Sequence, residues 1–407
     1  MELLVQKYGG TSVADPDRIR EVADHVARTL RHGARVVVVV SAMGKETDEL
    51  IRLAQDVSGV RPGREMDMLI TAGERKAMAL LCMALHFLGI AADSFTGSQA
   101  GFITDTAHGN AKILELRPQR VRAAVDAGRV PVVGGAQGVS TEQDVTFLGR
   151  NGSDTTAVAL AHALEADVCE LYTDVPGVFT ADPRLVPTAR RIAAMSFDEL
   201  LEMTATGCPK PAMRAVEYAR RWHVNLHVRS AFTWEPGTRV QQEDPSMEQA
   251  IVSAVTHDAS EAKVTVSGVP DRPGIAARMF RELADRAVNV DMIVQNVSDH
   301  GVTDISFTVP REHLEAATTI CAELAGEIGS SGVTSDAGIA RVSLIGAGMK
   351  SNPGVAATMF ETLAKNDINI EMISTSAIRT SCVVRAEQIE DAVAALHNAF
   401  GLETQSR

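Results

Sequence analysis

The sequence predicts an α/β protein: a three-layer α/β/α domain with a mostly parallel central sheet, followed by two small β-α-β-β-α-β domains. Apolar runs alternate with helical segments along the first half of the chain. Arg35–Val40 is a continuous β-branched run, typical of a parallel strand buried on both faces. Residues 273–293 and 353–373 align without a gap and are identical at eleven of 21 positions, which indicates a duplicated module.

Composition restricts the classes of partner. The 407 residues suffice for two or three domains, and the formal net charge is −13 with 4% aromatic residues. Basic surfaces and aromatic stacking platforms bind nucleic acids, and basic surfaces bind anionic membranes. We therefore expect no nucleic acid and no membrane among the partners. A basic pocket for a small anion remains possible, because net charge does not describe one cleft.

The five cysteines form no Cys-x-x-Cys pair, so a disulfide framework is not expected. Met1–Lys7 lacks the apolar stretch of a signal peptide. The longest strongly apolar run, Val36–Val40, is far shorter than the roughly 20 residues of a membrane helix. These features predict a cytoplasmic protein.

The first domain is read as strands and helices in alternation. The predicted strands are Leu3–Tyr8, Arg35–Val40, Val130–Val133 and Val168–Tyr172, and the predicted helices are Asp17–Leu30, Gly73–Leu88, Thr155–Ala163 and Ser196–Thr206. Ligands of such sheets bind beyond the carboxyl ends of the strands. Three polar or glycine-rich segments follow strand ends there: Lys7–Ser12, Ser41–Asp48 and Thr173–Gly177.

Domain boundaries follow from composition and from the repeat. We expect a first domain over residues 1–231 and a linker over 232–249, where proline, glycine and charged residues gather. The repeat domains are placed at 250–336 and 337–407, with the alternative that a strand at 250–256 completes the second. Each repeat reads as strand, Pro-Gly turn, helix, Asn-containing turn and strand.

Two glycine-rich motifs point to anion chemistry. Lys7-Tyr-Gly-Gly-Thr-Ser12 ends the first strand, where glycine amides and a lysine suit a phosphate; a tight turn with a solvated lysine is the alternative. In the segment Leu148–Thr156, Arg150 suits a carboxylate, and Ser153 and Asp154 either cap the helix or contact ligand. Walker, dinucleotide-fold and zinc-ligand patterns are absent from the sequence.

The ordered motifs closely resemble those of the aspartate kinase (aspartokinase) family, within the amino-acid kinase superfamily, with two C-terminal ACT domains. The resemblance covers about residues 2–400. The motifs are KYGGTSV at 7–13, SAMGKETD at 41–48, TAGER at 71–75, LGRNGSDTTAVALA at 148–161, TDVPGVFTADPR at 173–184 and RAVEYAR at 214–220, with VQN at 294–296 and GAGM to STS over 346–376 in the repeats.

The resemblance implies ATP-dependent phosphorylation of the side-chain carboxylate of L-aspartate, giving 4-phospho-L-aspartate, with ATP and Mg²⁺ as cofactors. This is the first step of the pathway to lysine, threonine and methionine. Lys7 and Asp154 are the implied catalytic residues, and no metal ligands are assigned. The implied aspartate-binding residues are Ser41, Thr47, Glu74, Arg150 and Ser153. The implied nucleotide-binding residues are Lys7, Tyr8, Gly9, Gly10, Thr173, Asp174, Phe179, Asp182, Arg184 and Lys210.

The resemblance also implies feedback inhibition by lysine and/or threonine through the ACT pair. The implied effector contacts are Asp271, Gly274, Ile275, Ala276, Asn289, Gln295, Asn369 and Ile370; alternatively, Asn289 and Asn369 only shape a turn. ACT pairing implies a homo-oligomer, or a hetero-oligomer with a shorter chain that starts near Met247.

Several residues depart from the family pattern. Asn151 replaces a glycine, Phe179 a tyrosine, Asn352 a histidine and Ala377 a glutamate, and Pro209 stands where a lysine is usual, with Lys210 one residue later. These departures leave three alternatives open: a paralogue with relaxed regulation, a kinase for another acid such as glutamate or a substituted aspartate, and a weakly catalytic amino-acid-sensing protein.

Overall fold

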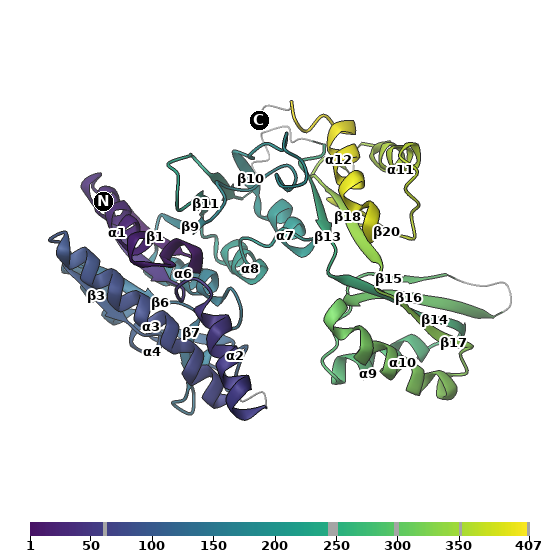
Figure 1. Cartoon of the computed structure of the whole chain (residues 1–407), viewed down its shortest axis with the longest axis horizontal. Coiled ribbons are helices and arrows are strands. Elements are labelled where there is room, and N and C mark those ends of the chain that lie inside the picture. Colours follow the sequence, from purple (N-terminus) through teal and green to yellow (C-terminus); the bar gives the residue numbers. More distant parts are fainter. Residues whose placement is uncertain (60–62, 243–250, 297–300, 350–351, 405–407) are drawn as a thin grey trace.

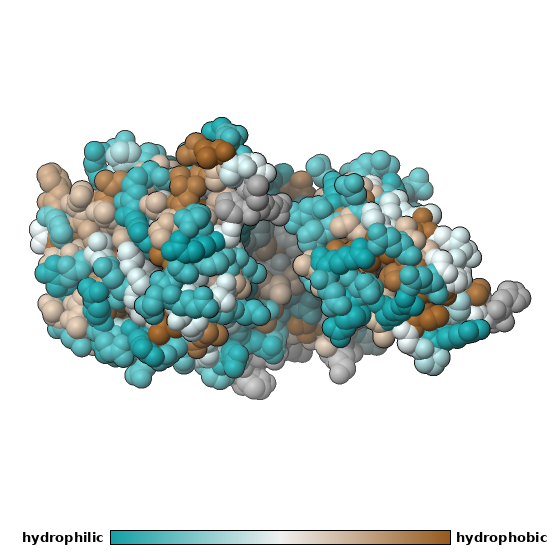
Figure 2. All heavy atoms as spheres, turned by 90° about the horizontal axis from the view of Figure 1, so that it is seen from below, coloured by the Kyte–Doolittle hydropathy of each residue, from teal (hydrophilic) through white to brown (hydrophobic). Residues whose placement is uncertain are grey.

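The computed structural model describes residues 1–59, 63–242, 251–296, 301–349 and 352–404. The N-terminal domain lies on one side of the molecule and the repeat domains on the other (Figure 1). Figure 2 shows these two sides as separate lobes with a hollow between them, and a surface of mostly hydrophilic residues in that view. No helix within the described ranges is long and apolar enough to cross a membrane.

An eight-stranded sheet forms the centre of the N-terminal domain, and its six strands from β11 to β3 are all parallel. This confirms the predicted mostly parallel sheet. The order is β10 (Ala194–Ser196), β12 (Thr238–Gln241), β11 (Leu226–Ser230), β9 (Val168–Thr173), β1 (Leu3–Tyr8), β2 (Arg35–Val40), β6 (Val130–Gly134) and β3 (Ala92–Phe95).

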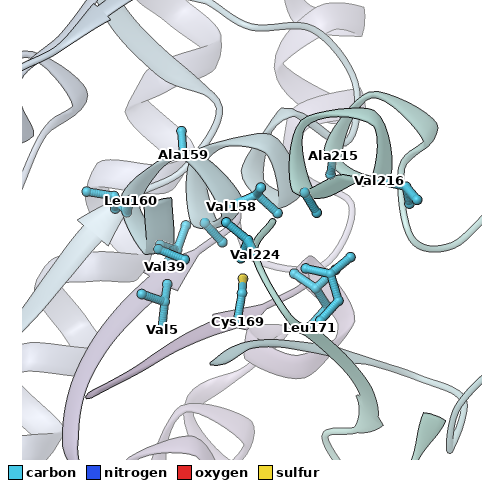
Figure 3. Packing of buried hydrophobic residues seen from close by; sticks show 14 of the residues in the cluster. Val5, Val39, Val158, Ala159, Leu160, Cys169, Leu171, Ala215, Val216 and Val224 are labelled. Atoms are coloured by element: carbon cyan, nitrogen blue, oxygen red, sulfur yellow. The ribbon is translucent and has the colours of Figure 1, made fainter. Parts of the chain in front are cut away.

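Helices cover both faces of this sheet. One face carries α1 (Pro16–Arg31) and α3 (Arg64–Phe87), with α2 (Glu46–Ser58) packed on α3. The other carries α5 (Gln119–Asp126), α6 (Gly152–Leu164) and α8 (Met213–Trp222), with α7 (Phe197–Ala205) beside α8. Figure 3 shows Val158 of α6 among the side chains over Val39 and Cys169 of the sheet. Because successive strand residues face opposite layers, Val38 and Val40 join the other core.

Two features of this domain were not predicted from the sequence. A second, four-stranded sheet lies beside the first, and α4 (Gly97–Ala100) packs on two of its strands. Its order is β5 (Ile113–Leu116), β4 (Phe102–Thr104), β7 (Gln137–Ser140) and β8 (Val145–Phe147). The segment 232–249, expected to be a linker, contributes strand β12 to the central sheet, and residues 243–250 lie outside the described residues.

Each repeat folds around its own four-stranded antiparallel sheet. The first repeat domain consists of β14 (Glu261–Pro270), α9 (Ile275–Asp285), β15 (Ile293–Gln295), β16 (Val302–Pro310), α10 (Leu314–Ile328) and β17 (Gly332–Asp336). The second consists of β18 (Ile339–Ile345), α11 (Val355–Lys365), β19 (Met372–Thr375), β20 (Arg379–Arg385), α12 (Ile389–Ala399) and β13 (Ala254–Asp258). Because β13 pairs with β18, the second sheet takes a strand that precedes the whole first repeat in sequence.

Arg341 of β18 joins all three domains. Its side chain is buried, with the residue 1% exposed. One guanidinium nitrogen, Nη2, donates to the carbonyl of Ala205 at the end of α7 at 3.0 Å and lies 2.9 Å from Glu261 Oε1 of the first repeat domain. The other, Nη1, pairs with Asp291. Burial raises the pKa of Glu261 to about 7, against the opposing effect of Arg341. The arginine therefore favours the ionised form of a carboxyl group whose charge burial opposes.

We predict that Arg341→Met lowers the free energy of unfolding by about 3–5 kcal/mol at pH 8, because Glu261 is left as a buried, uncompensated charge. Because the pKa of Glu261 is higher in the folded state than in the unfolded state, this carboxyl group stabilises the fold at low pH. The contribution is lost as the pH rises from the ordinary pKa of a glutamate through about 7. The loss should therefore be smaller at pH 5.5. Urea-induced unfolding at both pH values measures it.

The matched control is the double variant Arg341→Met with Glu261→Gln, which removes both charges and should regain part of the stability. Equal losses for Arg341→Met at pH 5.5 and pH 8 would contradict this account.

Candidate active site

The carboxyl ends of four parallel strands meet at one edge of the central sheet. Tyr8 of β1 is in register with Val40 of β2 and with Tyr172 of β9, and Val40 with Gly134 of β6. The loops that follow these strands therefore begin side by side, as expected from the sequence. They surround two adjoining cavities, which we name the polar cleft and the apolar cavity.

The polar cleft has a volume of about 320 Å³ and lies over the ends of β1, β2 and β9 and the start of α6. All of the predicted catalytic and aspartate-binding residues line it. The predicted site residues in its wall are Lys7, Gly9, Gly10, Ser41, Thr47, Glu74, Arg150, Ser153, Asp154, Thr173 and Lys210.

A buried ion pair lies in the floor of the cleft. Lys7 Nζ is 2.6 Å from Asp154 Oδ1, and the two side chains are 11% and 7% exposed. The other carboxylate oxygen, Asp154 Oδ2, accepts a hydrogen bond from the backbone N–H of Ala212 at 3.0 Å. Asp154 thus connects the end of β1, the first turn of α6 and the segment that leads into α8.

Helix α6 begins at Gly152 rather than at the predicted Thr155, so the interpretation of Ser153 and Asp154 as capping residues is wrong. The preceding residue, Asn151, adopts φ 58° and ψ 15°, the left-handed conformation that asparagine tolerates better than most residues. No side chain caps the helix. The hydroxyl of Ser153 instead forms a hydrogen bond with the hydroxyl of Ser41 at 2.7 Å. The amides of Gly152 and Asp154 donate to the carbonyls of Gly149 and Asn151, which leaves the Ser153 amide for a ligand in the cleft.

Two glycines bring backbone segments together at the cleft. A Cβ on Gly10 would lie 2.8 Å from the Ala42 carbonyl oxygen, and one on Gly73 would lie 2.8 Å from the Ala42 Cβ. Neither position has room for a larger residue. The glycine after β1 thus lets two loops touch, and the glycine in α3 brings the next residue, Glu74, against the loop after β2.

Glu74 is a buried carboxylate with unused hydrogen-bonding capacity. The residue is 3% exposed, and its Oε2 has no hydrogen-bond partner among the described residues. Burial raises the pKa of Glu74 to about 7, although a hydrogen bond from the Ala42 amide works in the opposite direction. Such an oxygen in a cleft wall fits a cationic group of a ligand.

Arg150 lies at the mouth of the cleft with its side chain 74% exposed, and its Nη2 donates to Asp48 Oδ1 at 2.8 Å. The guanidinium is therefore close to the cleft but still hydrated. The loop that carries it is held by Arg214 of α8, which donates to the carbonyls of Leu148 and Ala111, each at 2.9 Å. Sequence reasoning assigned Arg214 no role, although it opens the motif at 214–220.

The apolar cavity has a volume of about 380 Å³ and adjoins the cleft, and Lys210 lines both. Its wall includes the predicted residues Asp174, Phe179, Asp182, Arg184 and Lys210. Lys210 Nζ lies 2.7 Å from Asp174 Oδ1, so the lysine one residue late in the sequence still reaches the site. Hydrogen bonds from Arg184 lower the pKa of Asp182, which stays ionised.

Tyr8, predicted to contact nucleotide, has its side chain on the opposite face of the sheet. Its ring stacks on Tyr172 with centroids 4.8 Å apart, and its hydroxyl is 2.7 Å from His25 Nδ1. Tyr8 is 1% exposed, so a side-chain contact with nucleotide is excluded. Alternation along β1 explains the error, because Lys7 and Tyr8 must face opposite layers.

A third cavity, of about 300 Å³, lies in the first repeat domain at the start of α9. The predicted effector residues Asp271, Gly274, Ile275, Ala276 and Gln295 line it. Asn289 is exposed and does not line this cavity.

In the second repeat domain Asn369 is exposed, and Ile370 packs against the core of its own domain. Asn352 donates to the carbonyl of Gly348, and Ala377 is exposed.

The residues present fit Mg-nucleotide better than a resident metal ion. Within the described ranges no group of three or more His, Cys, Asp or Glu could hold a metal. Asp154 in the polar cleft and Asp174 in the wall of the apolar cavity each face a lysine. Mg²⁺ that arrives on phosphate oxygens needs only one or two protein carboxylates.

Comparisons with known proteins agree with this geometry. Residues 2–230 match the model of the amino acid kinase family, and residues 264–323 and 342–400 match that of the ACT domain. An aspartokinase of Mycolicibacterium smegmatis is 56% identical over 99% of this chain and 97% of its own. The crystal structure of E. coli aspartokinase III with aspartate and ADP (R-state) is 25% identical, with a TM-score of 0.81 over 98% of this chain and 99% of that one. The structure of the same enzyme with lysine and aspartate (T-state) is 25% identical, with a TM-score of 0.76 over 98% and 100% of the two chains.

We predict that Asp154→Asn lowers the free energy of unfolding by about 3 kcal/mol, because the buried ammonium of Lys7 loses its counter-charge while the acceptor for the Ala212 amide remains. Lys7→Met should cost a similar amount. Urea-induced unfolding of the two single variants and of the double variant measures the coupling. The double variant should lose clearly less than the sum, and strictly additive losses would rule out the ion pair as the stabilising contact.

Proposed function

The chain belongs to the aspartokinases, within the amino acid kinase family, and on that premise we propose that it transfers the γ-phosphoryl group of ATP to the side-chain carboxylate of L-aspartate. The product is 4-phospho-L-aspartate, which enters the pathway to lysine, threonine and methionine. The observation that carries the proposal is the unpartnered, buried oxygen of Glu74 in a cleft whose floor holds Lys7. A cleft with an ammonium at one point and a free carboxylate at another suits a phosphate beside an amino acid.

Lys7 and the glycine loop form the phosphate side of the cleft. The ammonium of Lys7 stabilises charge on the transferring phosphoryl group, and Asp154 fixes its position. Gly9, Gly10 and Ser153 line the same cleft. The Gly9 amide donates to the carbonyl of Tyr172 at 3.4 Å, so the amides of Gly10 and Ser153 are the ones left for phosphate. Because a carboxylate acceptor is ionised at neutral pH, the reaction needs no general base. Positioning and charge neutralisation are then the main tasks of the protein.

The aspartate side is assigned to the residues around Glu74. Glu74 accepts hydrogen bonds from the α-ammonium of aspartate. Arg150 releases Asp48 and binds the α-carboxylate of aspartate in its place. The hydroxyls of Ser41, Thr47 and Ser153 complete the set, and all three residues line the cleft. This assignment leaves the side-chain carboxylate directed toward Lys7.

The nucleotide is assigned to the apolar cavity. Phe179 and its apolar neighbours suit the base, while Asp174, Asp182, Arg184 and Lys210 surround it with charge. Thr173 lies between the cavities, in the wall of the polar cleft. Mg²⁺, when bound with ATP, neutralises the phosphate oxygens, and the carboxylates of Asp154 and Asp174 are the nearest candidates to hold it.

Regulation by lysine and/or threonine is assigned to the third cavity. The free amides at the start of α9 suit the carboxylate of an amino acid, and Asp271 suits its ammonium. Self-association is assigned to the repeat domains. Strands β15 and β19 lie at the edges of their sheets, where Ile293 and Ile373 are 50% and 44% exposed. A shorter chain starting at Met247, which lies outside the described residues, would retain β13 and both repeat sheets.

The test of the proposal is steady-state turnover of L-aspartate with Mg-ATP, with the acyl phosphate trapped as a hydroxamate, in the presence of lysine, threonine or both. We expect turnover, inhibition by one or both effectors, and about a tenfold higher inhibitory concentration in Asp271→Ala at unchanged kcat. Asp285→Ala, an exposed aspartate at the end of α9, is the matched control. No hydroxamate, or turnover of L-glutamate in its place, would overturn the substrate assignment.

We predict that L-aspartate binding near pH 7 releases protons, because burial raises the pKa of Glu74 to about 7 and the bound ammonium favours its carboxylate. The affinity for aspartate should consequently fall as pH drops below about 7. Isothermal titration calorimetry in buffers of different ionisation enthalpy measures the proton count.

Glu74→Gln keeps the shape of the side chain and should bind aspartate more weakly, with no proton released. A binding heat at pH 7 that is independent of the buffer would show that Glu74 is not the group that meets the ammonium.

A further inference from the structure

A strand of the second repeat domain forms part of the wall of the apolar cavity. β13 pairs with β18 in the sheet of the second repeat domain, yet Val255, Thr256 and His257 line the cavity. The remaining lining residues belong to the N-terminal domain, within segments 174–184 and 203–210. The cavity is therefore complete only when the second repeat domain is docked.

The docking of β13 is fixed by short contacts. The backbone N–H of Val255 donates to the carbonyl of Thr180 at 2.7 Å, and the hydroxyls of Thr256 and Thr206 are 2.6 Å apart. A Cβ on Gly207, whose φ is +113°, would lie 1.8 Å from the carbonyl oxygen of His257. The loop that carries Lys210 thus follows directly from a glycine pressed against β13. The wall is an integral part of the site rather than a loosely apposed surface.

His257 is the residue of β13 whose side chain is available to a ligand. It is half-buried, and within the described ranges its ring forms no hydrogen bond or ion pair. Thr256, by contrast, already uses its hydroxyl on Thr206. The imidazole lies close enough to Asp182 to help lower the pKa of that carboxyl, after the larger effect of Arg184. His257 and Asp182 thus place polar groups at one side of an otherwise apolar cavity.

The chemistry of the wall suits a purine. Val175, Val178, Phe179, Met203 and Val255 provide an apolar enclosure for a flat ring. A purine base also carries ring nitrogens and an exocyclic amine along its edge. An imidazole, which has one donor and one acceptor nitrogen when neutral, matches such an edge.

We propose that His257 is a nucleotide-binding residue that contacts the base of ATP, so that the second repeat domain supplies part of the substrate site. This inference rests on the proposed assignment of the apolar cavity to nucleotide. It adds a contact from the repeat domains to a site that was otherwise assigned to the N-terminal domain alone. A shift of β13 then acts on nucleotide affinity directly.

The experiment is a calorimetric titration of the full-length protein with ADP, together with steady-state kinetics, for wild type, His257→Ala and His257→Gln. For His257→Ala we expect about a tenfold weaker affinity for ADP and a similar rise in the KM for ATP. The value of kcat and the KM for aspartate should stay within about twofold, because His257 lies outside the polar cleft. His257→Gln retains a donor and an acceptor and should recover part of the affinity.

The matched control is His397→Gln. His397 of α12 belongs to the same interface, where its Nε2 lies 2.9 Å from Thr180 Oγ1, but it does not line the cavity. Its substitution should leave ADP affinity unchanged. An equal loss in this variant would assign the effect to domain docking and overturn the contact with the base.

The outcomes separate the two proposals. If wild type binds no ADP, the assignment of the cavity to nucleotide fails. If wild type binds ADP and His257→Ala binds it equally well, only the role of His257 fails. Circular dichroism checks the fold of each variant. If His257→Ala does not fold, His257→Leu, which keeps bulk but lacks both ring nitrogens, takes its place, and wild-type ADP affinity in that variant would overturn the inference.

Discussion

The ion pair between Lys7 and Asp154 is the contact on which the arrangement of the site depends. It joins Lys7, near the end of the central strand β1, to the first turn of α6. The second carboxylate oxygen of Asp154 accepts a hydrogen bond from the backbone N–H of Ala212. A buried pair of this kind adds little net stability but is costly to break. Its value lies in position, because it fixes one ammonium in the wall of the cleft. Phosphoryl transfer to a carboxylate requires this kind of fixed charge, since both reactants are anions.

Close backbone approach is the second constraint on the site. Gly10, Gly73 and Gly207 each stand where a Cβ would collide with another segment, and each brings a different partner to the cavities. Gly10 lets the loops after β1 and β2 touch. Gly73 lets the adjacent Glu74 lie against the loop after β2, and Gly207 lets the loop that carries Lys210 pack against β13. The site is therefore assembled from segments far apart in sequence. Substitution at any of the three should disturb ligand contacts before it disturbs the core.

Strand β13 connects the second repeat domain directly to the wall of the apolar cavity. After the N-terminal domain, the chain forms β13, which completes the sheet of the second repeat domain. Only then does the chain fold into the first repeat domain. Arg341 on the adjacent strand contacts both repeat domains and the end of α7. Contacts from both repeat domains thus reach the N-terminal domain at Ala205 and Gly207, beside the segment that carries Lys210. This arrangement provides a physical route for coupling two sites.

The sequence by itself determined the local and periodic features. The β-branched run at Arg35–Val40 predicted a buried parallel strand, the repeat predicted twin βαββαβ domains, and the motifs predicted most of the residues that line the polar cleft. Only the tertiary structure decided the features that depend on distant partners. The burial of Tyr8 away from the cleft follows from strand alternation, whereas the strand β12 within the expected linker depends on which segments meet in space. The place of a strand at 250–256 was left open by the sequence, and the pairing of β13 with β18 assigns it to the second repeat sheet. Composition and periodicity describe a segment and its own faces, and they carry no information about the distant atoms that satisfy its remaining hydrogen bonds and charges.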